Sequence, residues 1–275
     1  MKTVCDLCPR QCSLSEGQLG FCRARINRGG TIVCENYGRV TSIALDPIEK
    51  KPLRMFHPGA NILSVGSYGC NMDCGYCQNC EIARADSESV RWDTVSPEEL
   101  VSLADAYRPQ GNIGIAFTYN EPLVGFEFVR DCATLAKQRA LTTVLVSNGM
   151  VEPRYWDTLI PLIDAANIDL KAFTQDGYRA LGGDLETVKN TIASAQGRMH
   201  LELTTLIVPE FNDREDEMRR ACEWIASLSP EIPLHLSRFF PRHRMQSLDA
   251  TPVETIQKLA RIARDYLKYV FLGNL

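Results

Sequence analysis

Long apolar runs are missing from this sequence: no stretch reaches the roughly 20 residues that a helix needs to cross a bilayer. The N-terminus also lacks the apolar core of a secretory signal peptide, so we expect a cytoplasmic protein without a membrane partner. Positive charge is not in excess, because 30 Lys and Arg stand against 34 Asp and Glu, a net charge of −4. This balance does not indicate a nucleic-acid partner.

Several motifs with a known chemistry are absent as well. The sequence has no P-loop, no Gly-x-Gly-x-x-Gly loop and no His-Glu-x-x-His pair. It contains no repeat at the period of a solenoid and no low-complexity tract. These absences argue against nucleotide-phosphate, dinucleotide and HExxH zinc chemistry.

The composition is that of a globular protein, with 45% hydrophobic and 23% charged residues. A chain of 275 residues is long enough for one large domain and a small appendage. We therefore exclude disorder, collagen and coiled coil as its main organisation.

Cysteine is abundant, with 11 residues, nine of them within the first 80 positions. They occupy positions 5, 8, 12, 22, 34, 70, 74, 77, 80, 132 and 222. An odd number of thiols without an export signal favours metal ligands over disulfides. Cys132 and Cys222 fall inside helical patterns and are interpreted as small buried hydrophobes.

Two regions are expected. Residues 1–60 form a cysteine-rich, metal-binding segment, with a β-hairpin whose strands, 31–35 and 39–45, meet at a glycine turn. Residues 61–275 form a second domain in which strands and helices alternate. The predicted strands are 61–66, 112–117, 142–146, 166–170, 200–208, 233–237 and 269–272, and the helices between them begin near 96, 123, 154, 186, 212 and 251. Capping boxes are predicted at Ser96 with Glu99 and at Asn212 with Glu215.

This alternation predicts an α/β fold with parallel βαβ units, arranged as a partial or full β/α barrel of the TIM type. A doubly wound sheet is the alternative. In a barrel, chemistry gathers at the carboxyl ends of the strands.

Three cysteines follow the first predicted barrel strand as Cys70-x3-Cys74-x2-Cys77. Three thiolates can hold three irons of a [4Fe–4S] cube and leave the fourth iron open to a small ligand. A structural zinc site closed by Cys80 is the alternative.

The spacing, with Tyr76 as the aromatic residue before the third cysteine, resembles the radical S-adenosylmethionine (SAM) superfamily. The phrases at 5–12, 46–52, 118–122, 167–171 and 273–274 resemble its pyruvate formate-lyase activating enzyme-like branch, and within it the AmmeMemoRadiSam-system enzymes. That family carries further cysteines beyond its Gly-Asn pair, and we expect this protein to work without them, since the sequence ends at Leu275.

The resemblance implies an oxygen-sensitive enzyme in which a [4Fe–4S] cluster cleaves SAM and a 5′-deoxyadenosyl radical abstracts hydrogen. The favoured target is a glycine in a protein substrate, as in glycyl-radical enzyme activation, with flavodoxin or ferredoxin as the electron donor. A small molecule, RNA or peptide is the alternative target. A non-enzymatic electron carrier or zinc-binding module is the third hypothesis.

The resemblance also assigns residues to SAM. Tyr119, Asn120 and Glu121 stand where the family has Gly-Gly-Glu at the SAM amino group. The other expected cofactor contacts are Tyr76, Ser147, Asn148, Asp169 and Lys171, with Glu202 pointing inward from the fifth strand.

Two further sets of residues complete the expected site. His235 and Arg238 follow the sixth strand and are the candidate catalytic residues that meet substrate. Cys5, Cys8, Cys12 and Cys22 are the expected ligands of a second metal, which is either zinc or an iron–sulfur cluster. Cys34, on a predicted strand, is the alternative to one of these ligands.

Overall fold

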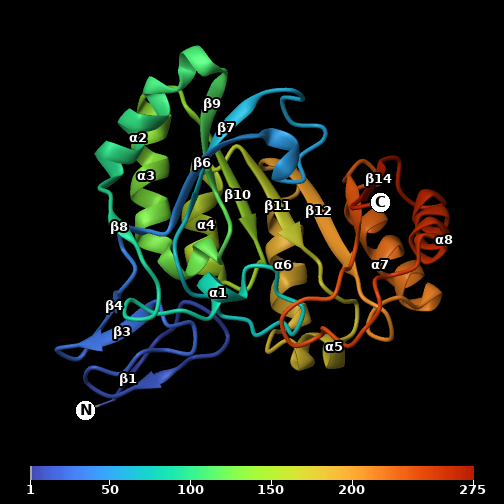
Figure 1. The fold of residues 1–275 in the computed structure, drawn as a ribbon, viewed down its shortest axis with the longest axis horizontal. Coiled ribbons are helices and arrows are strands. Elements are labelled where there is room, and N and C mark those ends of the chain that lie inside the picture. Colours follow the sequence, from blue (N-terminus) through green and yellow to red (C-terminus); the bar gives the residue numbers. More distant parts are fainter. Residues whose placement is uncertain (1) are drawn as a thin grey trace.

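The computed structural model describes residues 2–275, and its centre is one curved, eight-stranded sheet (Figure 1). Along the sheet the strands follow the order β14, β13, β12, β11, β10, β9, β7 and β6. Their bounds are β6 (Ser42–Pro47), β7 (Asn61–Gly66), β9 (Asn112–Phe117), β10 (Thr142–Ser147), β11 (Ala165–Asp169), β12 (His200–Ile207), β13 (Leu234–Arg238) and β14 (Val270–Gly273).

From β7 to β14 every neighbouring pair is parallel, and each new strand is added beside the previous one. Strand β6 alone runs antiparallel, on the outer side of β7. A doubly wound sheet would reverse its strand order partway, which does not happen here. The structure therefore confirms a partial parallel β/α barrel, with β6 and β14 at its two edges.

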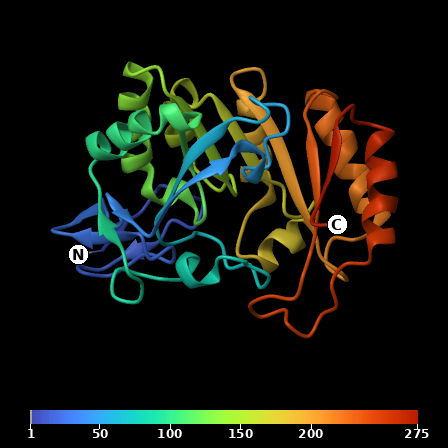
Figure 2. The ribbon, with the colours of Figure 1, turned by 45° about the horizontal axis from the view of Figure 1, so that its top comes forward.

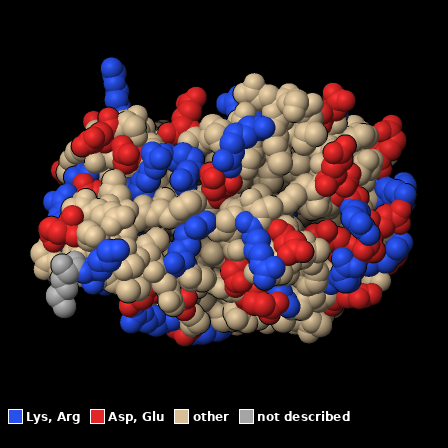
Figure 3. All heavy atoms as spheres, turned by 90° about the horizontal axis from the view of Figure 1, so that it is seen from below, with Lys and Arg blue, Asp and Glu red and all other residues tan. Residues whose placement is uncertain are grey.

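Helices cover the outside of the curved sheet (Figure 2). They are α2 (Pro97–Ala106), α3 (Phe126–Gln138), α4 (Pro153–Leu159), α6 (Leu185–Ala195), α7 (Glu215–Leu228) and α8 (Val253–Arg264). Two short helices, α1 (Cys80–Ala83) and α5 (Gln175–Ala180), lie at the carboxyl ends of the strands instead (Figure 1). No helix within residues 2–275 is both long and apolar enough to traverse a membrane. On the face seen from below, Lys and Arg are interspersed with Asp and Glu (Figure 3).

One of the two predicted capping boxes is present. At the start of α2, the Ser96 hydroxyl accepts the Glu99 amide at 3.2 Å and the Glu99 carboxylate accepts the Ser96 amide at 2.7 Å. The prediction at Asn212 is wrong, because α7 begins at Glu215. The Asn212 side chain instead closes the preceding loop, donating to the Lys171 and Leu206 carbonyls.

The predicted hairpin is also wrong. Strand β4 (Thr31–Cys34) pairs with β3 (Arg25–Arg28) across Gly29 and Gly30. Both glycines have positive φ, 61° and 79°, which two-residue hairpin turns favour. The remaining short strands are β1 (Thr3–Val4), which pairs with β2 (Ser13–Leu14), and β5 (Arg39–Val40), which pairs with β8 (Asp93–Thr94).

The segment between β6 and β7 forms the floor of the barrel. Ile48 and Leu53 are fully buried against inward-facing residues of the strands, Ile62, Ala116, Val144 and Ala165. The Pro52 carbonyl accepts a hydrogen bond from Asn167 at 2.8 Å. The predicted domain boundary at residue 60 stays a prediction. Strand β6 is nonetheless part of the main sheet, and the floor packs against the inner face of that sheet.

Candidate functional site

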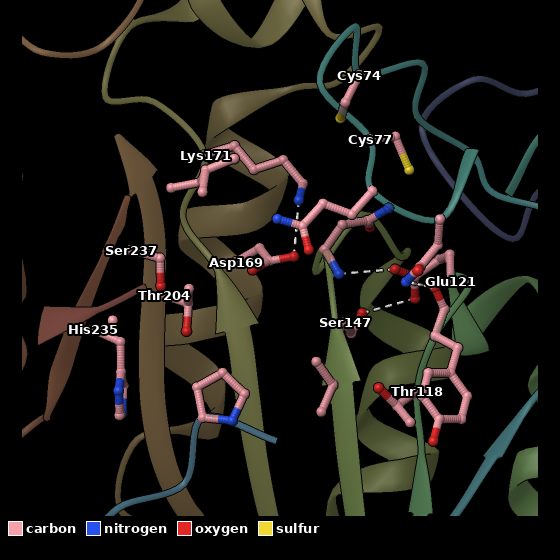
Figure 4. A pocket seen from close by; sticks show the side chains of 18 of the residues that line it. Cys74, Cys77, Thr118, Glu121, Ser147, Asp169, Lys171, Thr204, His235 and Ser237 are labelled. Atoms are coloured by element: carbon pink, nitrogen blue, oxygen red, sulfur yellow. Dashed lines mark hydrogen bonds and ion pairs between the residues drawn. The ribbon is translucent and has the colours of Figure 1, made fainter. Parts of the chain in front are cut away.

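A cavity of about 620 Å³ opens at the carboxyl ends of the strands (Figure 4). The cysteine loop after β7 forms one wall, and the ends of β9 to β14 form the others. Of the residues expected in the site, those that line this cavity are Cys70, Cys74, Tyr76, Cys77, Tyr119, Asn120, Glu121, Ser147, Asn148, Asp169, Lys171 and His235.

The cysteine loop is held against the N-terminal segment. The Cys70 amide donates to the Cys22 carbonyl at 3.2 Å. Gly69 is required here, because it has φ +94° and an added Cβ would lie 2.5 Å from that same carbonyl oxygen. Cys80 begins α1 and is not among the lining residues.

Burial keeps the cavity thiols protonated in the absence of metal. It raises the pKa of Cys74 to about 11 and the pKa of Cys70 well above its ordinary value. Metal ions bind the thiolate, so binding has to displace these protons. Within residues 2–275, no group of three or more His, Cys, Asp and Glu side chains is arranged to hold a metal ion as it stands.

Tyr76 presents an unusual hydroxyl. Its ring lies 6.1 Å from the Phe211 ring, and the side chain lines the cavity. The hydroxyl oxygen is buried without any hydrogen-bond partner in the described chain. A buried polar atom without a partner costs about 1–3 kcal/mol, so this hydroxyl marks a place where a ligand would supply the missing bond.

Glu121 joins the ends of β9 and β10. Its carboxylate accepts hydrogen bonds from the Ser147 hydroxyl at 2.8 Å, the Asn148 amide at 2.8 Å and the Leu123 amide at 3.0 Å. Burial raises the pKa of Glu121 to about 7, although these bonds and Lys171 oppose the rise. Because the carboxylate already has three donors, its expected contact with the SAM amino group stays a prediction.

Asn120 and Asn148 support the cysteine loop from two sides. Asn120 donates to the Gly69 carbonyl at 3.1 Å. Asn148 donates to the Asn71 side chain at 2.9 Å and lies 3.6 Å from the Cys70 sulfur. Both side chains therefore fix the base of this loop.

Tyr119 has φ +71°, a left-handed conformation that favours glycine, at the position where the family pattern has glycine. Its hydroxyl donates to Asp46 at 2.7 Å, and the Lys51 ammonium lies 4.7 Å from its ring. These contacts, with Asp46 of β6 and Lys51 of the floor, hold a strained backbone in place.

Asp169 and Lys171 form an ion pair of 2.8 Å beside the cysteine loop (Figure 4). Burial lowers the pKa of Lys171, but Asp169 and Cys74 outweigh burial and hold it well above its ordinary value. The cavity thus keeps a partly buried positive charge that suits a carboxylate ligand.

The structure places Glu202 beneath the cavity rather than in its wall, which corrects its expected role at the cofactor. The fully buried carboxylate contacts His200 at 2.8 Å and His235 at 2.5 Å, and it accepts the Arg54 and Met55 amides at 3.0 and 2.8 Å. Although burial opposes it, these bonds lower the pKa of Glu202 to about 2.

Of the two candidate catalytic residues, only one lines the cavity. His235 lines the cavity, with its Nε2 on Glu202 and its ring stacked on Phe271 at 5.2 Å. Arg238 does not line the cavity: its Nε donates to the Thr251 carbonyl at 2.6 Å, and its guanidinium lies over Phe240. The expectation that Arg238 meets substrate is corrected accordingly.

Thr204 points inward, as alternation along the fifth strand predicts. Other lining residues escaped sequence reasoning. Ser237 points inward, which strand alternation would have indicated from His235. Pro52 and Arg54 reach the cavity from the floor, and no sequence signal places that segment inside the barrel.

An open parallel β/α barrel with three cysteines after its first strand defines the radical SAM class of proteins. The model of the Radical SAM superfamily matches residues 64–222, and the chain belongs to this family.

Three relatives show where it lies within the family. An uncharacterized protein of Methanocaldococcus jannaschii is 36% identical over 99% of this chain and 81% of its own length. The pyruvate formate-lyase 1-activating enzyme of Escherichia coli K12 is 28% identical over 57% of this chain and 65% of its own length. A putative glycyl-radical enzyme activating enzyme of M. jannaschii is 26% identical over 76% of this chain and 87% of its own.

Solved structures agree with the fold. A domain of a pyruvate-formate lyase-activating enzyme from Bacteroides vulgatus has a TM-score of 0.52 at 19% identity, covering 58% of this chain and 99% of that domain. QueE from E. coli has a TM-score of 0.56 at 12% identity, covering 86% of this chain and 94% of its own. At these identities the likeness concerns the fold alone.

Radical SAM enzymes use a [4Fe–4S] cluster and SAM, and the residues of this cavity fit both. Three thiols share one wall, the partly buried Lys171 ammonium lines the same cavity, and the Tyr76 hydroxyl lacks a partner in the described chain. When bound, a cluster with one open iron supplies the electron that cleaves the SAM sulfonium. The separate assignments of residues to SAM atoms stay predictions.

Proposed function

We propose that this protein cleaves SAM reductively at a [4Fe–4S] cluster on Cys70, Cys74 and Cys77 and removes a hydrogen atom from its substrate. One observation carries the proposal: these three thiols and Lys171 line the same cavity at the carboxyl edge of the barrel. Lys171 and Asp169 orient the charged end of SAM, and Tyr76 donates its free hydroxyl to it.

The favoured substrate is a glycine in a partner protein. Relatives named as activating enzymes of pyruvate formate-lyase and of glycyl-radical enzymes support this choice. Loss of a hydrogen atom from a glycine Cα needs no proton-transferring residue. The electron would come from a flavodoxin or ferredoxin in the cytoplasm.

A second candidate is the modification of a small molecule, RNA or peptide. The observation that favours it is His235, which faces the cavity while its Nε2 is held by a buried carboxylate. A carboxylate that orients an imidazole is a common arrangement for acid–base chemistry. This candidate therefore has a residue ready to transfer a proton to or from substrate.

The deciding experiment is anaerobic reconstitution with iron and sulfide, followed by SAM and dithionite. We expect a brown protein that forms 5′-deoxyadenosine and methionine, measured by chromatography and mass spectrometry. A reconstituted protein that forms neither would contradict the proposal and leave the iron–sulfur electron carrier. Adding the candidate glycyl-radical partner should yield a protein radical detectable by electron paramagnetic resonance, and its absence would favour the second candidate.

The ion pair beside the cysteines gives a separate prediction. Lys171→Ala and Asp169→Asn should weaken SAM binding at least tenfold, about 1.4 kcal/mol, because each removes a charge beside the ligand. Iron content and melting temperature should remain close to wild type, since the pair lies at the cavity wall. Calorimetric titration of SAM checks the affinity. Equal losses of stability and binding would indicate a structural ion pair instead.

A further inference from the structure

The cysteine-rich N-terminal segment packs directly behind the cysteine loop of the barrel. Arg10 donates to the Asn71 carbonyl at 2.7 Å and to the Gly182 carbonyl at 2.6 Å. The Glu152 amide donates to the Leu7 carbonyl at 2.9 Å. In Figure 1 this segment lies beside the loops at the carboxyl ends of the strands. It is a second layer behind the candidate site.

Four thiols of this segment surround one small cavity. Cys5, Cys8, Cys12 and Cys22 line a space of about 10 Å³, room for about one water-sized sphere. All four are free thiols, and Cys5, Cys8 and Cys22 are at most 9% exposed. The hydrogen bond from the Cys5 amide to the Cys12 carbonyl, 2.9 Å, folds the loop that carries three of them. Four thiols around one space are the donor set of a tetrathiolate metal centre.

A buried nitrogen of Arg25 without a hydrogen-bond partner gives a second, independent indication of a ligand in this cavity. Its side chain lines the same cavity and is 4% exposed as a residue. One of its terminal nitrogens donates to Glu127 at 2.5 Å, but its Nε is buried without a hydrogen-bond partner. This N–H group belongs to a side chain that lines the same cavity as the four thiols; it lacks only an acceptor, and an anionic thiolate is one.

We propose that Cys5, Cys8, Cys12 and Cys22 bind one divalent zinc ion and that the Arg25 Nε–H donates to one of the coordinated sulfurs. Four S–H bonds break, four Zn–S bonds form, and four protons go to solvent. The product carries two negative charges, and no electron is transferred. The four thiols line the cavity but are not arranged to hold an ion as they stand, so zinc binding requires their side chains to rotate within it. A single ion suits the small volume better than a cube of four irons.

This zinc site is joined to the barrel cysteines by short contacts. Asn71 lines the N-terminal cavity, and its side-chain oxygen accepts the bond from Asn148. Asn148 in turn lies 3.6 Å from the Cys70 sulfur, while the Cys22 carbonyl accepts the Cys70 amide. An ion that fixes Cys8 and Cys22 therefore also fixes the base of the loop that carries Cys70.

The test uses the full chain with Cys70, Cys74 and Cys77 replaced by alanine, so that only the N-terminal site remains. Zinc alone is the probe, and bound metal is measured by mass spectrometry of the elements after gel filtration. We expect one zinc per chain, with about four protons released at neutral pH, as recorded with a pH indicator. A variant that binds no zinc, or that takes up several irons with sulfide in its place, would overturn the single-ion assignment.

Matched thiol variants test the ligands. Adding Cys8→Ser to the triple variant should lower zinc content more than tenfold. Adding Cys132→Ser instead removes a fully buried thiol of α3 that does not line this cavity. The zinc content of that variant should stay at one ion per chain. If Cys8→Ser fails to fold, Cys12→Ser is used with circular dichroism as the folding check, since Cys12 is more exposed. Equal zinc in the serine variants of Cys8 or Cys12 and of Cys132 would contradict the proposal.

The coupling is tested in the chain that keeps the barrel cysteines. After reconstitution, Cys12→Ser should lose iron to a chelator several times faster than Cys132→Ser, and identical rates would contradict the coupling. Neither measurement depends on SAM cleavage. If the protein binds zinc but does not cleave SAM, the proposed function is therefore contradicted and the zinc site is not.

Discussion

Replacement of Cys77 by serine is expected to remove the iron–sulfur cluster and at least a thousandfold of the SAM cleavage activity. The thiolate is the ligand that iron needs, and two remaining cysteines cannot hold three irons of a cube. Cys80→Ser is the matched control, since Cys80 lies three residues further on and outside the cavity wall. It should keep the iron content and the rate of the parent. Iron and sulfide assays and the rate of 5′-deoxyadenosine formation measure both effects.

One result would reverse this interpretation. If Cys80→Ser lost iron, or gained cleavage that the parent lacked, four thiolates would saturate the native cluster. A saturated cluster has no open iron for SAM, and the electron-carrier hypothesis would then replace the enzyme.

The largest loss of stability is expected for Glu202→Gln, about 3 kcal/mol in the free energy of unfolding. The substitution removes a buried negative charge that holds two histidines and two backbone amides, which hydrogen-bond to the carboxylate. The matched control is Glu186→Gln on the surface of α6, where the side chain is 67% exposed and pairs with Lys189. That change should cost less than about 1 kcal/mol. Urea denaturation followed by circular dichroism measures both variants.

The pH dependence of the free energy of unfolding follows from the same Glu202 carboxylate. Its pKa falls from 4.5 to about 2 in the folded protein, so the unfolded chain binds the proton first as pH drops. The stability that Glu202 contributes is complete above about pH 4.5 and disappears as pH falls toward 2. The difference between wild type and Glu202→Gln should narrow over this range. A constant difference would show that the charge is not what stabilises the floor.

The regular part of the fold could be predicted from sequence because its signals are local. Each predicted strand from 61–66 to 269–272 appears within two residues of its expected bounds, and α2 begins at its predicted capping box. The position of Asp169 and Lys171 also follows from a local rule, since residues at the carboxyl end of a barrel strand face the cavity.

The rest depends on contacts between distant segments, which no local pattern encodes. The 39–45 stretch looked like half of a hairpin, but residues 39–40 pair with β8 and residues 42–45 pair with β7, while 31–34 pairs across the two glycines. Glu202 pointed inward as alternation indicated, yet the amides that hold it come from the floor. Arg238 is the exception: it lies three residues after the inward-facing His235, so strand alternation alone places it on the other face of β13, where its side chain donates to the Thr251 carbonyl.

The floor also has a consequence for the order in which the chain folds. The bond between the Arg54 amide and Glu202 joins residues 148 positions apart, and the bond between Pro52 and Asn167 joins residues 115 apart. During synthesis the segment 48–56 emerges well before β11 and β12, which hold it. Contacts of such sequence separation form late, because the intervening chain must first be ordered. Ile48 and Leu53 can pack on β7, β9 and β10 once those strands have formed, but their contact with Ala165 of β11 and the bonds of the floor to Glu202 must wait for the second half of the barrel.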